Sequence, residues 1–412
     1  LLVSYSSYFS TYDRNQSFTT DAAVVDDSVS FFRAGANASE EDNEVEDLTV
    51  RLDNEWHLSN SHDLKIGLGL SSFNSHYFAT MNDTMRLVSR ETEAMQGFLY
   101  LQDLWKISPS VELTAGVRGV YYDKTSSTYL EPRASLIYSL SEKITLKGAW
   151  GHYHQFVNRI ANENILEGSR DFWVLADEEL KPDFAEHFIL GASYENSDYL
   201  FDVEGYYKDL DNMVEYTRRV TRRIMRTDVA RGFFQGTGFS RGLEFLAQKK
   251  RGKLTGWIGY TLGKVEYDFP ELNNGNPFPA SHDRTHELNV VSRYSIGNWD
   301  LSATWVYATG KAYTAPESQY YIELLDGSQR SYIHVSDKNA YRLPGYHRLD
   351  FSISRKFETD TAEFALGFSI FNLYNNKNIW YRKYDLDTVP VAVTDVTMLG
   401  ITPTVYFQIY SR

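Results

Sequence analysis

The segment from Val111 to Trp150 reads VELTAGVRGVYYDKTSSTYLEPRASLIYSLSEKITLKGAW and alternates between apolar and polar residues with a period of two. Its first part places apolar side chains at every second position: Val111, Leu113, Ala115 and Val117. Successive side chains of a β-strand point to opposite faces, whereas a helix needs a period of 3.6. The segment therefore predicts β-strands that have one apolar face.

The same alternation continues along most of the chain, for example over 199–204, 287–296 and 348–353. We expect roughly sixteen strands, many of them about ten residues or longer, which is the length that a tilted membrane strand requires. Strands of soluble proteins more often run for about 5–6 residues. Strand length therefore favours a membrane barrel over a soluble sandwich, which would also alternate.

Short and long connections take turns between these strands. The short ones are expected near 59–62, 108–109, 141–142, 196–198, 250–252, 297–298 and 359–360. The long ones are expected near 13–46, 79–92, 156–182, 212–231, 268–282, 310–341 and 375–394, with a brief exception at 123–128. Outer-membrane barrels have short periplasmic turns and long external loops. The chain is therefore predicted to be an all-β, transmembrane antiparallel barrel.

The alternation also predicts which side chains face lipid. We expect an outward-facing apolar set that includes Leu136, Leu146, Val203, Leu288 and Phe351. We expect an inward-facing charged set that includes Arg133, Glu204, Arg293 and Asp350. A slip of one residue would exchange the two faces and expose every charge to lipid.

Composition narrows the class of protein further. The 412 residues include no cysteine, which excludes a disulfide framework and thiolate metal sites. The formal net charge of -14 argues against a nucleic-acid partner. Aromatic residues make up 15% of the chain, with Tyr the commonest, and Tyr and Trp suit membrane interfaces.

No apolar run reaches the roughly 18 residues of a transmembrane helix, and no signal peptide is present. Because the first residues, LLVSYSSYFS, already read as a strand, we expect an N-terminal part of the parent protein to be missing.

Several motifs resemble those of TonB-dependent outer-membrane receptors, especially receptors of Bacteroidetes type. They are EPRAS at 131–135, LKGAWG at 146–151 with Gln155, LKP at 180–182, GLE at 242–244, TGKAYT at 309–314, RLPGYHRLD at 342–350, FNLYNN at 371–376 and GITPT at 400–404. The sequence RLPGYHRLD is the most specific of these, whereas Ala312 stands where the family usually has Pro. The matches run from about residue 130 to the end.

The resemblance implies a receptor in the cell outer membrane, with a plug domain followed by a barrel of 22 strands. Residues 1–412 would then be the C-terminal part of that barrel, and the plug domain and first strands would be absent from this chain. The resemblance also implies active transport of a nutrient such as a siderophore, glycan or peptide, driven by the TonB complex through the missing N-terminal region. A surface lipoprotein is a further partner that such receptors use, and no cofactor or enzymatic activity is implied.

An arginine cluster is the most unusual local feature of this acidic chain. Its members in a predicted external loop are Arg218, Arg219, Arg222, Arg223 and Arg226. Arginine presents a planar fork that matches carboxylates and phosphates, so we hypothesise that the cluster captures an anionic ligand. The alternatives are contact with lipopolysaccharide phosphates, with a partner protein, or with acidic residues of the stretch 13–46.

Aromatic residues in two other predicted external loops are the second candidate site. Tyr320, Tyr321, Trp380 and Tyr381 are suited to stacking on sugars or on the rings of a siderophore. The alternative is an interfacial girdle or simple loop packing.

Other residue patterns are weaker indications of a functional site. His152 and His154 are spaced for a shared strand face, but two His without a third ligand predict no metal site. The sequence shows no nucleophile elbow, phosphate loop or dinucleotide fingerprint, so we expect no enzyme. Two rival functions stay open: a sixteen-stranded passive porin, and a barrel that binds a surface protein or takes part in secretion.

Overall fold

The computed structural model describes residues 1–20, 33–81, 85–162, 170–216, 232–323, 325, 327, 329–358, 362–385 and 391–411. Within the described residues, one large sheet of 19 strands includes sixteen wall strands that follow one another as neighbours. They are β1 (Leu2–Thr20), β2 (Arg33–Ser59), β3 (His62–Met81), β4 (Met85–Ser108), β5 (Val111–Tyr122), β6 (Ser127–Ser139), β7 (Ile144–Gln155), β10 (Asp183–Glu195), β11 (Tyr199–Tyr216), β12 (Phe233–Lys249), β13 (Leu254–Asp268), β15 (His286–Ile296), β16 (Trp299–Ala308), β21 (Tyr346–Glu358), β22 (Ala362–Phe371) and β25 (Thr402–Ser411).

The remaining elements lie in the connections between these wall strands. They are β8 (Val157–Asn162), β9 (Arg170–Leu175), β14 (Phe278–Pro279), β17 (Ala312–Tyr313), β18 (Pro316–Glu323), β19 (Gln329–Val335), β20 (Tyr341–Arg342), β23 (Ile379–Asp385), β24 (Ala392–Thr397) and the 3₁₀ turns η1 (Asp123–Thr125) and η4 (Asn273–Gly275). Among the described residues, no helix has the length and hydropathy needed to cross a membrane.

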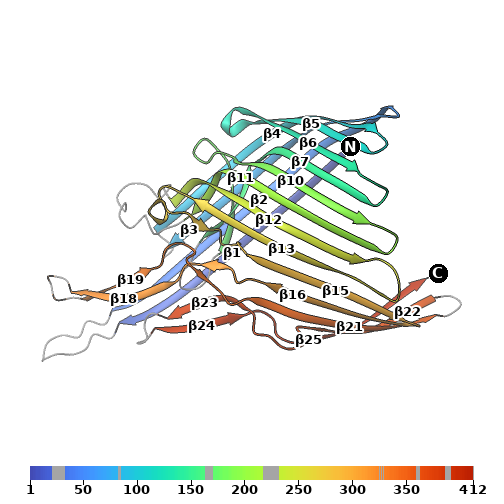
Figure 1. Ribbon diagram of the computed structural model, residues 1–412. Coiled ribbons are helices and arrows are strands. Elements are labelled where there is room, and N and C mark those ends of the chain that lie inside the picture. The colour runs from blue at the N-terminus through green and yellow to red at the C-terminus, as the bar shows by residue number, and fades with distance from the viewer. Residues whose placement is uncertain are drawn as a thin grey trace.

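The wall is a single curved antiparallel sheet (Figure 1). Each wall strand pairs with the next wall strand, even where β8–β9, β14, β17–β20 or β23–β24 lies between them in the sequence. Within the described residues, β1 pairs only with β2 and β25 pairs only with β22, so the first and last strands do not close on each other.

Pairing across the wall confirms the two predicted faces. Arg133 lies opposite Gly151 on β7, and Lys147, four residues from Gly151, binds the carboxylates of Asp202 and Glu204 on the same face. Leu136 lies opposite Gly148 on the other face. The pairing of later strands separates the same two faces. Leu288 and Phe351 lie on the apolar face, and Arg293 and Asp350 lie on the charged face. A shift of one residue in the register between two of these strands would have exchanged their apolar and charged faces.

Glycines on the charged face let long side chains reach across a whole strand. The Tyr100 hydroxyl on β4 crosses Gly67 on β3 and donates to Asp53 Oδ1 on β2, at 2.7 Å. A Cβ atom on Gly67 would lie 2.4 Å from the Tyr100 ring, so no other residue leaves this path open. Lys147 crosses Gly191 on β10 in the same manner.

The first four strands are longer than the sequence predicted. Residues 33–46 belong to β2, and residues 85–92 belong to β4, although both stretches were expected to be loop. The expectation of long loops at 13–46 and 79–92 is therefore wrong, because β1–β4 continue as paired strands over lengths of 19 to 27 residues. A membrane strand needs only about 9–11 residues, so these strands extend beyond a bilayer.

Candidate functional site: the lumenal hairpin and the external loops

The long connections gather at one end of the wall. Figure 1 shows β18–β19 and β23–β24 projecting at the end opposite the short turns that join β10 to β11 and β12 to β13. The described parts of the loops 156–182, 310–341 and 375–394 therefore lie on the predicted side. In outer-membrane barrels this end faces the exterior and the short turns face the periplasm.

One of these connections folds inward rather than outward. The hairpin β8–β9 pairs along its length from Val157 opposite Leu175 to Asn162 opposite Arg170. Its Trp173 is held by Asn43 of β2: the Trp173 amide donates to Asn43 Oδ1 at 2.8 Å, and Asn43 Nδ2 donates to the Trp173 carbonyl at 3.0 Å. At the other end, Asn162 pairs with Tyr216 of β11. The hairpin thus spans from β2 to β11 across the charged face of the wall.

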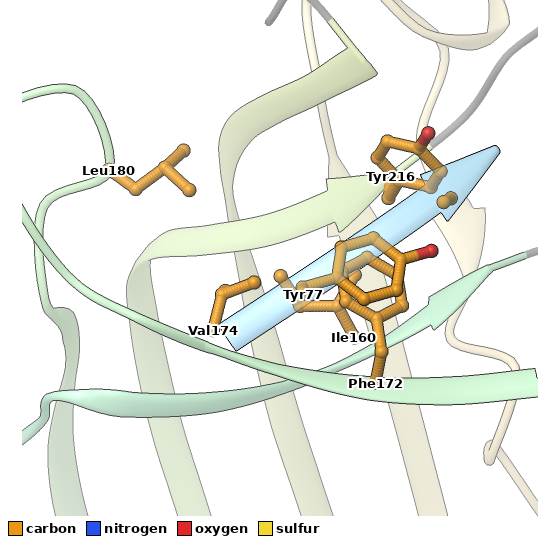
Figure 2. Close-up of a cluster of buried hydrophobic side chains, with 7 residues drawn as sticks. Tyr77, Ile160, Phe172, Val174, Leu180 and Tyr216 are labelled. Carbon is orange, nitrogen blue, oxygen red and sulfur yellow. The ribbon is translucent and has the colours of Figure 1, made fainter. Parts of the chain in front are cut away.

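A cluster of buried side chains fixes the hairpin to both sides of the wall. Figure 2 shows the rings of Tyr77 (β3), Phe172 (β9) and Tyr216 (β11) gathered together. The Tyr77 and Phe172 rings stack with centroids 4.0 Å apart, and Tyr216 meets Phe172 edge-on at 5.4 Å. Five wall strands separate β3 from β11 in the sheet order. Because side chains on one face of both strands meet the same hairpin, that face is concave and is the lumen.

A second buried cluster anchors the chain just after the hairpin. The Tyr122 hydroxyl of β5 donates to the Ala176 carbonyl at 2.8 Å, and its ring packs on Phe156 at 4.6 Å. Leu175 and Ala176 are fully buried in this cluster. Burying an aromatic side chain of this size stabilises the contact by roughly 1.5–3 kcal/mol. The hairpin is therefore an ordered part of the lumen and not a loose surface loop.

A charged cluster lies on the lumenal face beside the second buried cluster. The Glu131 carboxylate is 2% exposed and lies 3.5 Å from Arg118, 3.4 Å from Arg133 and 2.9 Å from the His154 amide, which donates to it. The Arg118 guanidinium also covers the Phe98 ring at 4.4 Å. Two cations around one buried carboxylate leave a positive charge on this part of the lumen wall.

A buried ion pair joins two of the external connections, the one between β13 and β15 and the one between β16 and β21. Arg342, from the RLPGYHRLD motif, binds the Asp283 carboxylate and donates through Nη1 to the carbonyls of Asp283 and Gly310, at 3.1 and 3.2 Å. Asp283 is 2% exposed and also accepts the Val265 amide at 2.6 Å. Removing one partner of such a buried pair is strongly destabilising, so Arg342 fixes how these loops leave the wall.

A cavity of about 780 Å³ lies beside this ion pair. Its lining includes Tyr206, Gly242, Gly263, Thr285, Asp283 and Arg342. The Tyr206 side chain lies across Gly242, where a Cβ atom would come within 2.7 Å of its hydroxyl. The volume is in the range of small-molecule sites, and a phenol, a hydroxyl and a guanidinium supply polar contacts.

Two external loops meet in a cluster of aromatic and charged side chains. Arg382 of β23 donates to the Tyr313 hydroxyl at 3.0 Å and pairs with Asp395 of β24 at 2.9 Å. The Tyr313 and Tyr384 hydroxyls are 3.4 Å apart. Burial, followed by the hydrogen bond with Tyr313, raises the pKa of Tyr384, so this phenol stays protonated at neutral pH. The cluster fixes the 310–341 and 375–394 connections to each other.

The predicted aromatic ligand residues lie in the part of the chain that the structure describes, whereas the predicted arginines do not. Arg218, Arg219, Arg222, Arg223 and Arg226 lie outside the described residues. Tyr320 and Tyr321 belong to β18, and Tyr320 is 48% exposed. Trp380 and Tyr381 belong to β23, where Trp380 is 59% exposed and contacts the Tyr381 ring edge-on at 5.3 Å.

The structure brings residues of the predicted loops together through partners that the sequence did not single out. Asn43, Tyr313 and Arg382 form the principal contacts, yet none lies in a spacing that marks a site. Arg342 and Tyr313 stood in recognised motifs, RLPGYHRLD and TGKAYT, whereas Asn43 and Arg382 did not.

His152 and His154 take part in separate contacts. His152 Nε2 lies 3.3 Å from Glu186, whereas His154 lies beside Glu131 and Phe184. Within the described ranges, no group of three or more His, Asp or Glu side chains is arranged to hold a metal ion.

A wide antiparallel wall with an apolar outer face, a charged lumen and loops gathered at one end is the architecture of an outer-membrane β-barrel. The chain belongs to the family of TonB-dependent receptor-like β-barrels, whose model matches residues 2–373. Members of this family are transporters and not enzymes. The Bacteroidetes type stays a prediction.

Solved structures share the fold at low sequence identity. The ferripyoverdine receptor of the outer membrane of Pseudomonas aeruginosa is 11% identical with a TM-score of 0.57, over 99% of this chain and 54% of that chain. The ferric citrate transporter FecA is 12% identical with a TM-score of 0.53, over 98% and 59%. The siderophore receptor PirA from Acinetobacter baumannii is 12% identical with a TM-score of 0.55, over 100% and 60%. The chain thus spans little more than half the length of these proteins. No curated protein matches its sequence.

Proposed function

We propose that this chain is the C-terminal barrel part of an outer-membrane receptor that binds a nutrient at its external loops and imports it with TonB energy. The observation that carries the proposal is the cluster in which Arg382 joins Tyr313 to the 375–394 connection. A rigid rim of aromatic rings and a guanidinium suits an anionic ligand that has flat groups.

The proposed ligand class is an anionic metal chelate of the siderophore type. Three solved structures of similar fold are described as a receptor for ferripyoverdine, a ferric citrate transporter and a siderophore receptor. Exposed Tyr320 and Trp380 would stack on the ligand, and the arginine cluster of Arg218, Arg219, Arg222, Arg223 and Arg226 would attract its charge. A glycan or peptide ligand is the alternative that the same aromatic side chains support.

In the whole protein we propose a plug domain and about six further strands before residue 1, on the pattern of a 22-stranded barrel. The edges of β1 and β25 support this, because neither pairs on its outer side within the described residues. Unpaired backbone groups in a bilayer cost several kcal/mol each, so neighbouring strands would satisfy them. TonB would act through the preceding segment.

Binding of ferric siderophores to the purified full-length protein tests the rim. Arg382→Gln should weaken the affinity roughly tenfold, because a charge-assisted contact is lost. Arg293→Gln is the matched control, since Arg293 pairs with Asp300 at 2.8 Å near the turn end, away from the rim. Equal affinity of all three proteins would remove the rim from the proposed site.

The arginine cluster has its own test in whole cells. Replacing Arg218, Arg222 and Arg226 by Gln should reduce uptake of an anionic nutrient, most strongly at low salt, because attraction is screened over a Debye length of about 8 Å at physiological ionic strength. Replacing Lys143, Arg251 and Lys253 at the turn end removes the same charge and should leave uptake unchanged. Unchanged uptake by the first variant, at normal abundance in the membrane, would assign the cluster to lipopolysaccharide or packing.

A further inference from the structure

An arginine faces outward at the turn end of the wall. Arg355 lies on β21 two residues beyond Ile353, on the same face as Phe351, and is exposed. Its direct partner across the pairing is Trp299, the first residue of β16. Since Phe351 belongs to the lipid-facing set, the Arg355 side chain also projects from the outer surface.

The neighbours of Arg355 on this surface are apolar. Ile296 and Trp299 precede it in the row of paired residues, and Leu366 and Phe407 follow it. Leu366 is 49% exposed and Phe407 is 60% exposed, as expected for side chains that contact lipid. A cation in such a row is destabilising, least near the interface and most at the midplane of the bilayer.

Two aromatic rings hold the guanidinium of Arg355. Its Cζ atom lies 5.3 Å from the centroid of the Trp299 ring and 4.9 Å from that of the Phe357 ring. Contacts with ring faces leave the N–H groups at the edge of the guanidinium available. The described residues provide Arg355 with no hydrogen bond and no carboxylate within ion-pair distance.

Two other outward-facing charges of the wall have partners within the protein. Asp103 near the same end pairs with His62 at 2.7 Å, and Lys264 near the external end pairs with Glu266 at 2.7 Å. Arg355 is held by two rings instead, which leaves its N–H groups open to a partner from outside the chain.

We infer that Arg355, with Trp299 and Phe357, binds the phosphodiester group of a phospholipid in the periplasmic leaflet. A phosphate accepts two parallel hydrogen bonds from the edge of a guanidinium, and the lipid chains would cover the apolar row on either side. The turn end places the site in the periplasmic leaflet. This inference rests on the proposed placement of the barrel in the outer membrane, but not on the nutrient that it carries.

Native mass spectrometry of the full-length receptor in detergent, titrated with phosphatidylglycerol, tests the site. Arg355→Gln should weaken the tightest lipid-binding step roughly tenfold, because its charge-assisted hydrogen bonds are lost. Arg355→Lys keeps the charge without the fork and should fall between that variant and the wild type. Arg251→Gln, at an exposed turn on the same end, is the matched control and should bind as the wild type does.

Three results would overturn the inference. The first is wild-type affinity in Arg355→Gln, and the second is an equal loss in Arg251→Gln, which would indicate general attraction to the rim. The third is displacement of the lipid by glycerol phosphate, which would indicate a free-phosphate site. If Arg355→Gln fails to fold, Trp299→Leu retains the arginine and removes one ring, and it should weaken binding several-fold. Nutrient uptake should not change in any of these variants, so failure of the lipid site and failure of the receptor function are distinguishable.

Discussion

Asn43 and Trp173 are 130 positions apart in the sequence, and the Asn43 side chain binds both the N–H and the C=O of the Trp173 backbone, at 2.8 and 3.0 Å. The same side chain donates to the His76 carbonyl at 3.1 Å. A 5% exposed amide thus replaces the strand partner that β9 lacks along this edge. It is the principal polar link between the lumenal hairpin and the wall.

Asn43→Ala should loosen the hairpin without unfolding the wall. It leaves the Trp173 amide without its acceptor, at a cost of roughly 1–3 kcal/mol, whereas the Trp173 carbonyl keeps the Ser75 hydroxyl at 3.4 Å. Hydrogen exchange of the 170–176 segment should therefore become about tenfold faster, or more. Asn74→Ala is the control, because the Asn74 side chain lies on the exposed outer surface, where it donates to Glu46 at 3.3 Å. Equal protection in the two variants would contradict the assigned role of Asn43.

Asp183 should make docking of the hairpin dependent on pH. It lies at the external end of β10, beyond the outward pair of Glu186 and His152, and it accepts Asn158 Nδ2 of β8 at 2.9 Å. Burial raises the pKa of Asp183 to about 7. Because this pKa is above the unfolded value of 3.8, the stabilisation is complete below about pH 4 and is lost as pH rises through about 7.

Asp183→Asn removes this dependence while keeping an oxygen that accepts from Asn158. At about pH 8 the variant should protect residues 157–162 from hydrogen exchange better than the wild type, and below about pH 4 the two should agree. Comparing both proteins at the same pH cancels the intrinsic exchange rate. A difference that is the same at both values of pH would show that Asp183 does not titrate as described.

Gly67 should be intolerant of any side chain. A Cβ atom there would lie 2.4 Å from the Tyr100 ring and 2.7 Å from Asp53, which breaks the hydrogen bond across β3. Gly67→Ala should therefore destabilise the barrel by roughly 1–3 kcal/mol in urea titrations in lipid vesicles. Gly119→Ala is the control, since its nearest neighbour, Leu130, is 3.8 Å away. Equal stability of the two variants would disprove the crossing.

The two faces of β6 give a direct test of orientation. Leu136→Arg places a charge against lipid and should cost roughly 2–4 kcal/mol of folding free energy in vesicles. Ser135→Arg adds the same side chain to the lumenal face, opposite Ala149, and should cost much less. Equal losses, or a larger loss for Ser135→Arg, would mean that the faces are reversed.

The alternation of apolar and polar residues predicted the wall strands correctly where their outer face contacts lipid. Leu136, Val203 and Leu288 face a uniform apolar solvent, so their period of two is regular. The failure at 13–46 and 79–92 has a physical cause: above the bilayer both faces of a strand meet water. Glu44 and Asn43 therefore follow each other on opposite faces of β2 without any apolar periodicity.

The candidate site was less accessible to prediction from the sequence. The local sequence around Ile160, Phe172 and Val174 predicts only short strands. It does not indicate that these side chains lie in the lumen and contact Tyr77 and Tyr216. Contacts of such high sequence separation depend on the curvature of the whole wall. The motif at 342–350 did identify Arg342, because the motif holds a buried ion pair.

Uptake of a radiolabelled ferric siderophore by cells expressing the full-length protein tests the central claim most directly, when cells with and without a functional TonB complex are compared. A TonB-driven receptor should show saturable uptake that disappears without TonB, while the abundance of the protein in the outer membrane stays the same. Uptake that rises linearly with concentration and is unaffected by loss of TonB would contradict the proposed function and identify a passive channel.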